Sequence, residues 1–293
     1  MSAGFTLDIA GLALALTADA DLPIEAEGSA RKFVRAPGAA GPPPVARLHA
    51  RWGDPCVPSP AVVGFDSGKG LWRMYRTAAG PEFVFTSASL GAAPYQVAAF
   101  DEAFSEGRVT LRRSAFADRR ALYPLHYPLD EVFMVHLLAR GFGVELHGAG
   151  VVTPEGRGWL FVGQSGAGKT TMSKLWRAEA GVSVLSDERI IVRREGDGLW
   201  MYGTPWHGDG YIAEPGRAPV ERVLLLRHGP ENALAAVSRA QAAARLFSAA
   251  FVPFHDAAGL DFSLALLDDV VASCRCEELA FVPDRRVVDF LRR

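Results

Sequence analysis

The sequence feature that most constrains the fold is a glycine-rich segment between an apolar run and a helix-forming run. The segment reads Gly163-Gln164-Ser165-Gly166-Ala167-Gly168-Lys169-Thr170 and matches the G-x-x-x-x-G-K-[ST] pattern. Residues 158–162 before it have the composition of a buried strand, and residues 170–180 after it suit a helix that Gly181 closes. A strand, this loop and a helix in that order predict a phosphate-binding loop (P-loop) in an α/β sheet.

The residue types of this segment suit a triphosphate. Glycines let the backbone approach phosphate oxygens closely, and the start of the following helix adds the positive end of its dipole. Lys169 is expected to reach the β- and γ-phosphates as a catalytic group, and Thr170 offers a hydroxyl to Mg²⁺. The expected nucleotide-binding residues are Gly163, Gln164, Ser165, Gly166, Ala167, Gly168, Lys169, Thr170 and Thr171. The alternative is an ordinary glycine turn, which needs neither the lysine nor the threonine.

An acidic pair follows the next predicted strand. Residues 182–185 read as that strand, and Asp187 and Glu188 come directly after it. The carboxyl ends of parallel strands meet at one rim of the sheet, so the pair is expected to face the phosphates. One carboxylate would take the proton of an acceptor hydroxyl, and the other would hold Mg²⁺. The candidate metal ligands are Thr170, Asp187 and Glu188. The alternative is a solvated turn with two acids.

Asp187 lies 18 residues after Lys169, and His147-Gly148 precedes the phosphate-loop strand. This order of motifs resembles the catalytic domain of HPr kinase/phosphorylase, whose fold is akin to phosphoenolpyruvate carboxykinase, over roughly residues 129–220. The resemblance implies ATP and Mg²⁺ as cofactors, Asp187 as the base, Glu188 as a metal ligand and His147 beside the acidic pair. Glu188 stands where that family has aspartate, and the downstream glycine-rich signature of its bifunctional members is absent. HPr as the substrate, and the phosphorylase reaction, therefore do not follow.

Two further candidates come from loop composition. Residues 203–211 place glycines, an indole, an imidazole and a carboxylate together, so His207 is a candidate for binding the nucleotide or the acceptor. A structural aromatic turn is the alternative for this stretch. Arg217, in a turn-rich stretch before an apolar strand, is a candidate to steady charge on the transferred phosphoryl group.

Composition bounds the class of protein. The 293 residues are 49% hydrophobic and carry 31 basic and 33 acidic side chains, so no global charge attracts nucleic acid or a membrane surface. The three cysteines do not form a disulfide framework, and no export signal or membrane span is recognisable, which favours a cytoplasmic protein. Short apolar stretches with turn residues predict a β-rich module over residues 1–127, and α/β texture predicts the P-loop domain over residues 128–293.

The fold class we predict is therefore α/β, a P-loop kinase domain of the HPr kinase and carboxykinase type preceded by a β-rich module. The predicted activity is transfer of the γ-phosphoryl group of ATP to a hydroxyl. The acceptor would be a serine or threonine of a protein or peptide, or a small molecule, and a homo-oligomer is left open. Two alternatives are an ATP-sensing module without catalysis and a carboxykinase-like enzyme acting on a small carboxylic acid.

Overall fold

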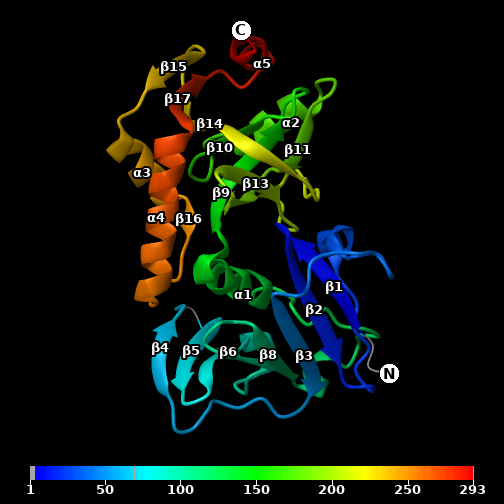
Figure 1. Ribbon diagram of the computed structural model, residues 1–293. Coiled ribbons are helices and arrows are strands. Elements are labelled where there is room, and N and C mark those ends of the chain that lie inside the picture. The colour runs from blue at the N-terminus through cyan, green and yellow to red at the C-terminus, as the bar shows by residue number, and fades with distance from the viewer. Residues whose placement is uncertain (1–3, 69, 293) are drawn as a thin grey trace. The chain divides into compact units, whose positions relative to one another are not determined.

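The computed structural model describes residues 4–68 and 70–292, which form two compact units, Met1–Leu137 and Leu138–Arg293 (Figure 1). Both units contain a large sheet, and the chain is of mixed α/β class, as predicted. The predicted domain boundary was at residues 127/128, and the structural division falls after Leu137 because the helix α1 packs within the first unit. Within the described residues, no helix combines the length and the apolar composition that crossing a membrane requires.

The first unit contains an eight-stranded sheet in the order β1-β2-β3-β8-β7-β6-β5-β4. Its elements are β1 (Gly4–Ile9), β2 (Leu12–Ala18), β3 (Ala46–Trp52), β4 (Val62–Asp66), β5 (Trp72–Thr77), β6 (Gly80–Phe85), β7 (Gln96–Phe100), β8 (Glu106–Leu111) and α1 (Leu129–Leu137). Strands β2, β3 and β8 run parallel to one another, and the other neighbours are antiparallel.

Aromatic side chains form much of the interior of this first unit. Phe83 packs edge-on to Phe100, with ring centroids 5.9 Å apart, and Phe133 of α1 stacks on Phe100 at 5.3 Å. His136 is buried one helical turn further on, where its ring contacts Phe83 at 5.0 Å and its Nδ1 lies 2.6 Å from the Val132 carbonyl. The apolar helical pattern around His136 predicts a packed residue there, and the structure confirms it.

The second unit contains a nine-stranded sheet. Its elements are β9 (Val144–Val152), β10 (Gly158–Val162), α2 (Lys169–Arg177), β11 (Ser183–Ser186), β12 (Arg189–Glu195), β13 (Gly198–Gly203), β14 (Arg217–His228), β15 (Ala233–Ala236), α3 (Arg239–Ser248), β16 (Ala250–Phe251), α4 (Ala257–Ser273), β17 (Arg275–Phe281) and α5 (Arg286–Leu291). Strand β10 lies between β9, which is antiparallel to it, and β14, which is parallel.

Helices cover both faces of this sheet (Figure 1). Side chains alternate along β10, so that Leu160 packs with residues of α3 and α4, and Phe161 packs with residues of α2 and α5. Trp176 of α2 is fully buried and meets Trp159 edge-on at 5.2 Å. Burying a large apolar side chain contributes about 1.5–3 kcal/mol, so this contact holds the helix, and with it the loop before the helix, against the sheet.

Candidate functional site

The loop between β10 and α2 adopts the backbone that its glycines permit. Gly166 and Gly168 have φ values of 82° and 99°, in the left-handed region that L side chains rarely adopt. Space is also restricted at Gly168, where an added Cβ would lie 2.4 Å from Cζ of Phe281. The helix α2 begins at Lys169, so its first N–H groups and the positive end of its dipole lie at the loop. This arrangement has the backbone geometry expected of a P-loop.

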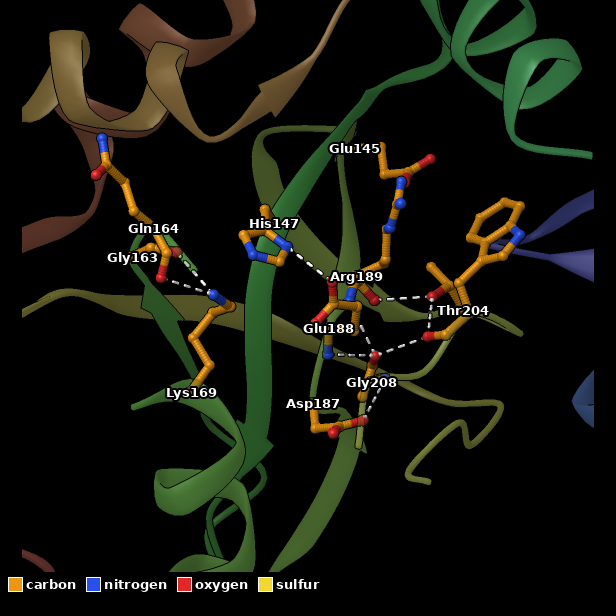
Figure 2. Close-up of polar contacts among 12 residues, drawn as sticks. Glu145, His147, Gly163, Gln164, Lys169, Asp187, Glu188, Arg189, Thr204 and Gly208 are labelled. Carbon is orange, nitrogen blue, oxygen red and sulfur yellow. Dashed lines mark hydrogen bonds and ion pairs between the residues drawn. The ribbon is translucent and has the colours of Figure 1, made fainter. Parts of the chain in front are cut away.

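Lys169 folds back over this loop (Figure 2). Its Nζ donates to the carbonyl oxygens of Gly163 at 2.8 Å and Gln164 at 3.1 Å. The side chain is 5% exposed, and burial lowers the pKa of its ammonium, while the Glu188 carboxylate opposes that shift. A buried ammonium held by carbonyls of its own loop is placed to exchange those carbonyls for phosphate oxygens.

A polar pocket of about 450 Å³ opens beside the helix start. Of the predicted site residues, its lining includes His147, Ser165, Gly166, Gly168, Lys169, Thr170, Thr171, Glu188 and His207. Four segments of the chain therefore converge there: β9, the P-loop with the start of α2, the turn between β11 and β12, and the loop after β13. The other predicted loop residues, Gly163, Gln164 and Ala167, line a second cavity that shares Ser165 and Gly166 with the first.

Asp187 is fully buried, and its carboxylate accepts hydrogen bonds from the protein backbone. Its oxygens accept backbone N–H groups from Gly208 at 3.1 Å, Gly210 at 2.7 Å and Ile212 at 3.3 Å. The fit is close, because a Cβ added at Gly210 would lie 2.4 Å from Oδ2 of Asp187. A carboxylate that accepts three amides fixes the backbone that supplies them. Asp187 thus holds the loop that carries His207 in place.

Glu188 points the other way, into the pocket, and meets His147 of β9 (Figure 2). Nδ1 of His147 lies 3.2 Å from Oε1 of Glu188, and both side chains are partly exposed. Burial lowers the pKa of His147, and the charges of Lys169 and Arg189 lower it further, while Glu188 opposes the shift. A pKa below the ordinary histidine value favours the neutral imidazole near pH 7.

The turn that carries Glu188 is fixed by hydroxyl groups on both sides. Oγ of Ser186 accepts the N–H groups of Glu188 and Arg189, each at 3.1 Å, and donates to the Trp206 carbonyl at 3.1 Å. The Thr204 hydroxyl donates to the Arg189 carbonyl at 2.8 Å. These bonds connect the acidic turn to the loop after β13, so the two walls of the pocket are joined directly.

Sequence reasoning missed a buried ion pair between Arg189, which directly follows this turn, and Glu145 of β9. Nη1 of Arg189 lies 2.7 Å from Oε1 of Glu145, which is fully buried, and the guanidinium lies 4.0 Å from the ring centroid of Phe251. The signal in the sequence was a carboxylate in the middle of an apolar strand, Val144-Glu145-Leu146, because a charge is rarely buried without a partner.

Two further predicted site residues, His207 and Arg217, make contacts away from the P-loop. The ring of His207 packs against Tyr211 at 4.9 Å, and its Nδ1 lies 3.0 Å from the Gly208 carbonyl. Arg217 does not lie with the other site residues. Its guanidinium pairs with Glu195 at the far end of β12. Glu188 lies directly before the start of the same strand, so Arg217 and Glu188 are at opposite ends of β12. Arg217 also lies 4.5 Å over the ring of Trp200, so both its charge and its flat face are engaged elsewhere.

The donor set of the pocket suits a hard divalent cation. Thr170 contributes a hydroxyl and Glu188 a carboxylate, and Mg²⁺ takes oxygen ligands of this kind, usually one or two from protein together with phosphate oxygens. Among the described residues, no three His, Cys, Asp or Glu side chains are grouped to hold a metal ion by themselves. The residues present therefore fit a cation that arrives with a nucleotide.

The second unit is thus a mixed α/β sheet with a P-loop at the end of one strand and an acidic turn beside it. No protein-family model matches the chain, and no curated protein matches it. Among solved structures, it is similar to the HPr(Ser) kinase/phosphatase from Coxiella burnetii. That similarity covers 50% of this chain and 90% of the other, with 13% identity and a TM-score of 0.28. A superposition this weak carries no argument, so the function is argued from the geometry of the site.

Proposed function

We propose that the protein is an ATP- and Mg²⁺-dependent kinase that transfers the γ-phosphoryl group to a hydroxyl. The acceptor is a serine or threonine of a protein or peptide, or a small molecule. One observation carries the proposal: the P-loop lysine and threonine line the same pocket as the carboxylate of Glu188. Phosphoryl transfer requires a phosphate-binding loop, a ligand for the cation and a group that takes the acceptor proton. Residues suited to all three roles line this one cavity.

The transfer needs one bond to form and one to break. The acceptor oxygen bonds to the γ-phosphorus, the bond from that phosphorus to the bridging oxygen breaks, and ADP leaves with the electron pair. The acceptor proton passes to a carboxylate of the pocket. Lys169 and the N–H groups at the start of α2 face the phosphate oxygens, where charge must be stabilised. A bound Mg²⁺ would neutralise further phosphate charge.

The contacts favour Glu188 over Asp187 as the proton acceptor. Asp187 already accepts three backbone amides and does not line the pocket, whereas Glu188 lines it and meets a neutral imidazole. The sequence motif had suggested Asp187 for this role, with Glu188 as a metal ligand. In our proposal Asp187 positions the loop that closes one wall, and Glu188 acts beside Thr170, which keeps the hydroxyl ligand for Mg²⁺.

Replacing Lys169 with alanine tests the proposal. The variant should lose phosphoryl transfer by on the order of 10³-fold, because the charge that faces the phosphates is removed. The matched control is Lys174→Ala, which removes an exposed lysine from the same helix and should leave transfer unchanged. The assay incubates each protein with γ-labelled ATP, Mg²⁺ and candidate acceptors, including peptides encoded beside its gene, and identifies the phosphorylated species by mass.

Two outcomes contradict the proposal in different ways. Undiminished transfer by the folded Lys169→Ala protein would show that the P-loop is not the donor site. ATP binding by the wild-type protein without transfer to any hydroxyl would leave a nucleotide-binding module that lacks catalysis.

A further inference from the structure

A second cavity adjoins the acidic pocket at the P-loop. It has a volume of about 410 Å³ and lies between the loop, the end of β14 and the end of α3. Ser165 and Gly166 line both cavities, so the two cavities adjoin at the P-loop. A ligand bound along this loop could therefore extend from the acidic pocket into the second cavity.

The walls of this second cavity combine an apolar floor with two flat polar side chains, an imidazole and a guanidinium. Val162, Leu225 and Ala249 contribute apolar surface, and His228 and Arg245 lie at the polar edge. Small-molecule sites usually have this composition, an apolar lining with a few placed polar groups, and a volume in this range. The acidic pocket is more polar, and its lining holds Lys169, Glu188 and Asp209 instead.

The two flat side chains are fixed by contacts behind them. Nε2 of His228 donates to the Gly166 carbonyl at 2.7 Å, and the ring stacks on Phe281 with centroids 5.8 Å apart. The Arg245 guanidinium donates to Glu278 at 2.7 Å and to the Leu226 carbonyl at 3.0 Å. Pre-organised imidazole and guanidinium planes favour stacking with an aromatic base, since little side-chain freedom is lost on binding.

We propose that this cavity binds the nucleoside end of the phosphate donor. The inference rests on the proposed function, which places the γ-phosphate on the side of Glu188. The phosphates would then cross the loop at Ser165 and Gly166, and the base and ribose would enter the second cavity beyond them. Strand β14 runs parallel to β10 and ends at His228, so the cavity lies at the carboxyl ends of neighbouring strands, where open α/β sheets bind ligands.

The test compares MgATP with inorganic tripolyphosphate, which has the phosphates but no nucleoside. Ser248 is exposed at the end of α3 and lines the second cavity, so Ser248→Trp would fill it with an indole. The variant should bind MgATP about tenfold or more weakly by calorimetry and keep tripolyphosphate affinity within about twofold. Ala244→Trp is the matched control, because Ala244 is exposed on the same helix outside the lining, and it should change neither affinity.

The outcomes separate this inference from the proposed function. Wild-type protein that binds tripolyphosphate as tightly as MgATP would overturn the nucleoside assignment and leave the proposed transfer standing. So would unchanged MgATP affinity, or an equal loss for both ligands, in Ser248→Trp. Wild-type protein that binds neither ligand would overturn the proposed function together with this inference.

Photo-crosslinking gives a second readout that needs no variant. An ATP analogue with an azido group on the base, bound to the wild-type protein and irradiated, should label peptides within residues 225–249. Competition with unlabelled ATP should remove the label. Labelling confined to the 205–212 loop would place the base on the acidic side and overturn the proposal.

Discussion

The two units bury polar side chains of different kinds. Within the described residues of the first unit, the buried side chains in the polar or charged class are Gln96 and His136, neither of which is a carboxylate, an ammonium or a guanidinium. The second unit buries charged groups, namely Glu145, Lys169, Asp187, Arg222 and Glu277. Burying a charge costs free energy unless partners compensate, so a unit that buries several must organise hydrogen bonds around them.

The difference indicates a division of roles within the chain. The apolar interior of the first unit favours stability, because well-packed aromatic side chains contribute to folding without partners to satisfy. The charged interior of the second unit orders a pocket. Lys169 lines this pocket, and Asp187 accepts three amides from the loop that forms one of its walls. Substitutions in the second unit should therefore change chemistry first, and those in the first unit should change stability first.

The largest expected effect is on transfer, from Glu188→Gln. This variant keeps the size of the side chain and removes its basicity, so the rate of phosphoryl transfer should fall by about 10²- to 10⁴-fold. Affinity for MgATP should stay within a few-fold, since the P-loop and Thr170 are intact and the glutamine amide keeps an oxygen that Mg²⁺ can accept as a ligand. A single-turnover assay and equilibrium binding measure the two quantities separately. Wild-type transfer by Glu188→Gln would return the proton-accepting role to Asp187.

The next largest effect is on stability, from Phe133→Ala in the first unit. Phe133 is fully buried and stacks on Phe100, so its loss should lower the free energy of unfolding by about 3–5 kcal/mol. Chemical denaturation measures this change, and MgATP affinity of the folded protein should not change. Phe254→Ala is the matched control, because that ring is 63% exposed. If the Phe133→Ala protein kept its stability but lost nucleotide binding, the division of roles would be reversed.

A smaller effect is expected from Asp187→Asn, the neighbour of Glu188. Each hydrogen bond to a charged acceptor contributes on the order of 1.5–3 kcal/mol, and the amide keeps only part of this bonding. The variant should lose about 1–3 kcal/mol of stability, and hydrogen exchange should accelerate at Gly208, Gly210 and Ile212. Exchange at these amides that stays at the wild-type rate would contradict the positioning role.

The smallest effect is a pH dependence from His147. Its pKa is lowered by burial, so acid pH protonates it only below the ordinary histidine range, and the cation then attracts Glu188. The unfolded chain binds this proton more readily, so stability should fall as the pH drops below about 6.5. The facing charged groups are Glu188, Lys169 and Arg189. We expect His147→Gln to shift the acid limb of the pH profile of the phosphoryl-transfer rate to lower pH. An unshifted limb would show that protonation of His147 does not control this rate.

The sequence predicted those features that depend on local patterns. Strand β10 was predicted at 158–162, where it occurs, because a continuous apolar run before glycines is a local signal. The alanine-rich run Ala233–Phe247 has a helical pattern and predicts one helix, which is wrong at its start. Residues Ala233–Ala236 form β15 instead, since they pair with the edge of β17, and α3 begins after Ser238, whose capping box with Gln241 fixes the helix start.

The arrangement of the candidate site depended on contacts between distant residues. The amides that occupy Asp187 come from residues 208–212, so no local pattern distinguishes the buried acid from the one facing the pocket. Arg217 was predicted as a site residue because its surroundings are rich in turn residues. Its guanidinium pairs with Glu195 instead, and Arg217 does not line the pocket. The second cavity depends on β14 lying beside β10, which a sequence of this kind does not specify.

A crystal structure of the protein with Mg²⁺ and a non-hydrolysable ATP analogue tests the central claim most directly. Our account places the γ-phosphate against Lys169 and Glu188, with the base beyond Gly166 near His228. A γ-phosphate bound on the His228 side, with Glu188 facing only water and His147, would contradict it.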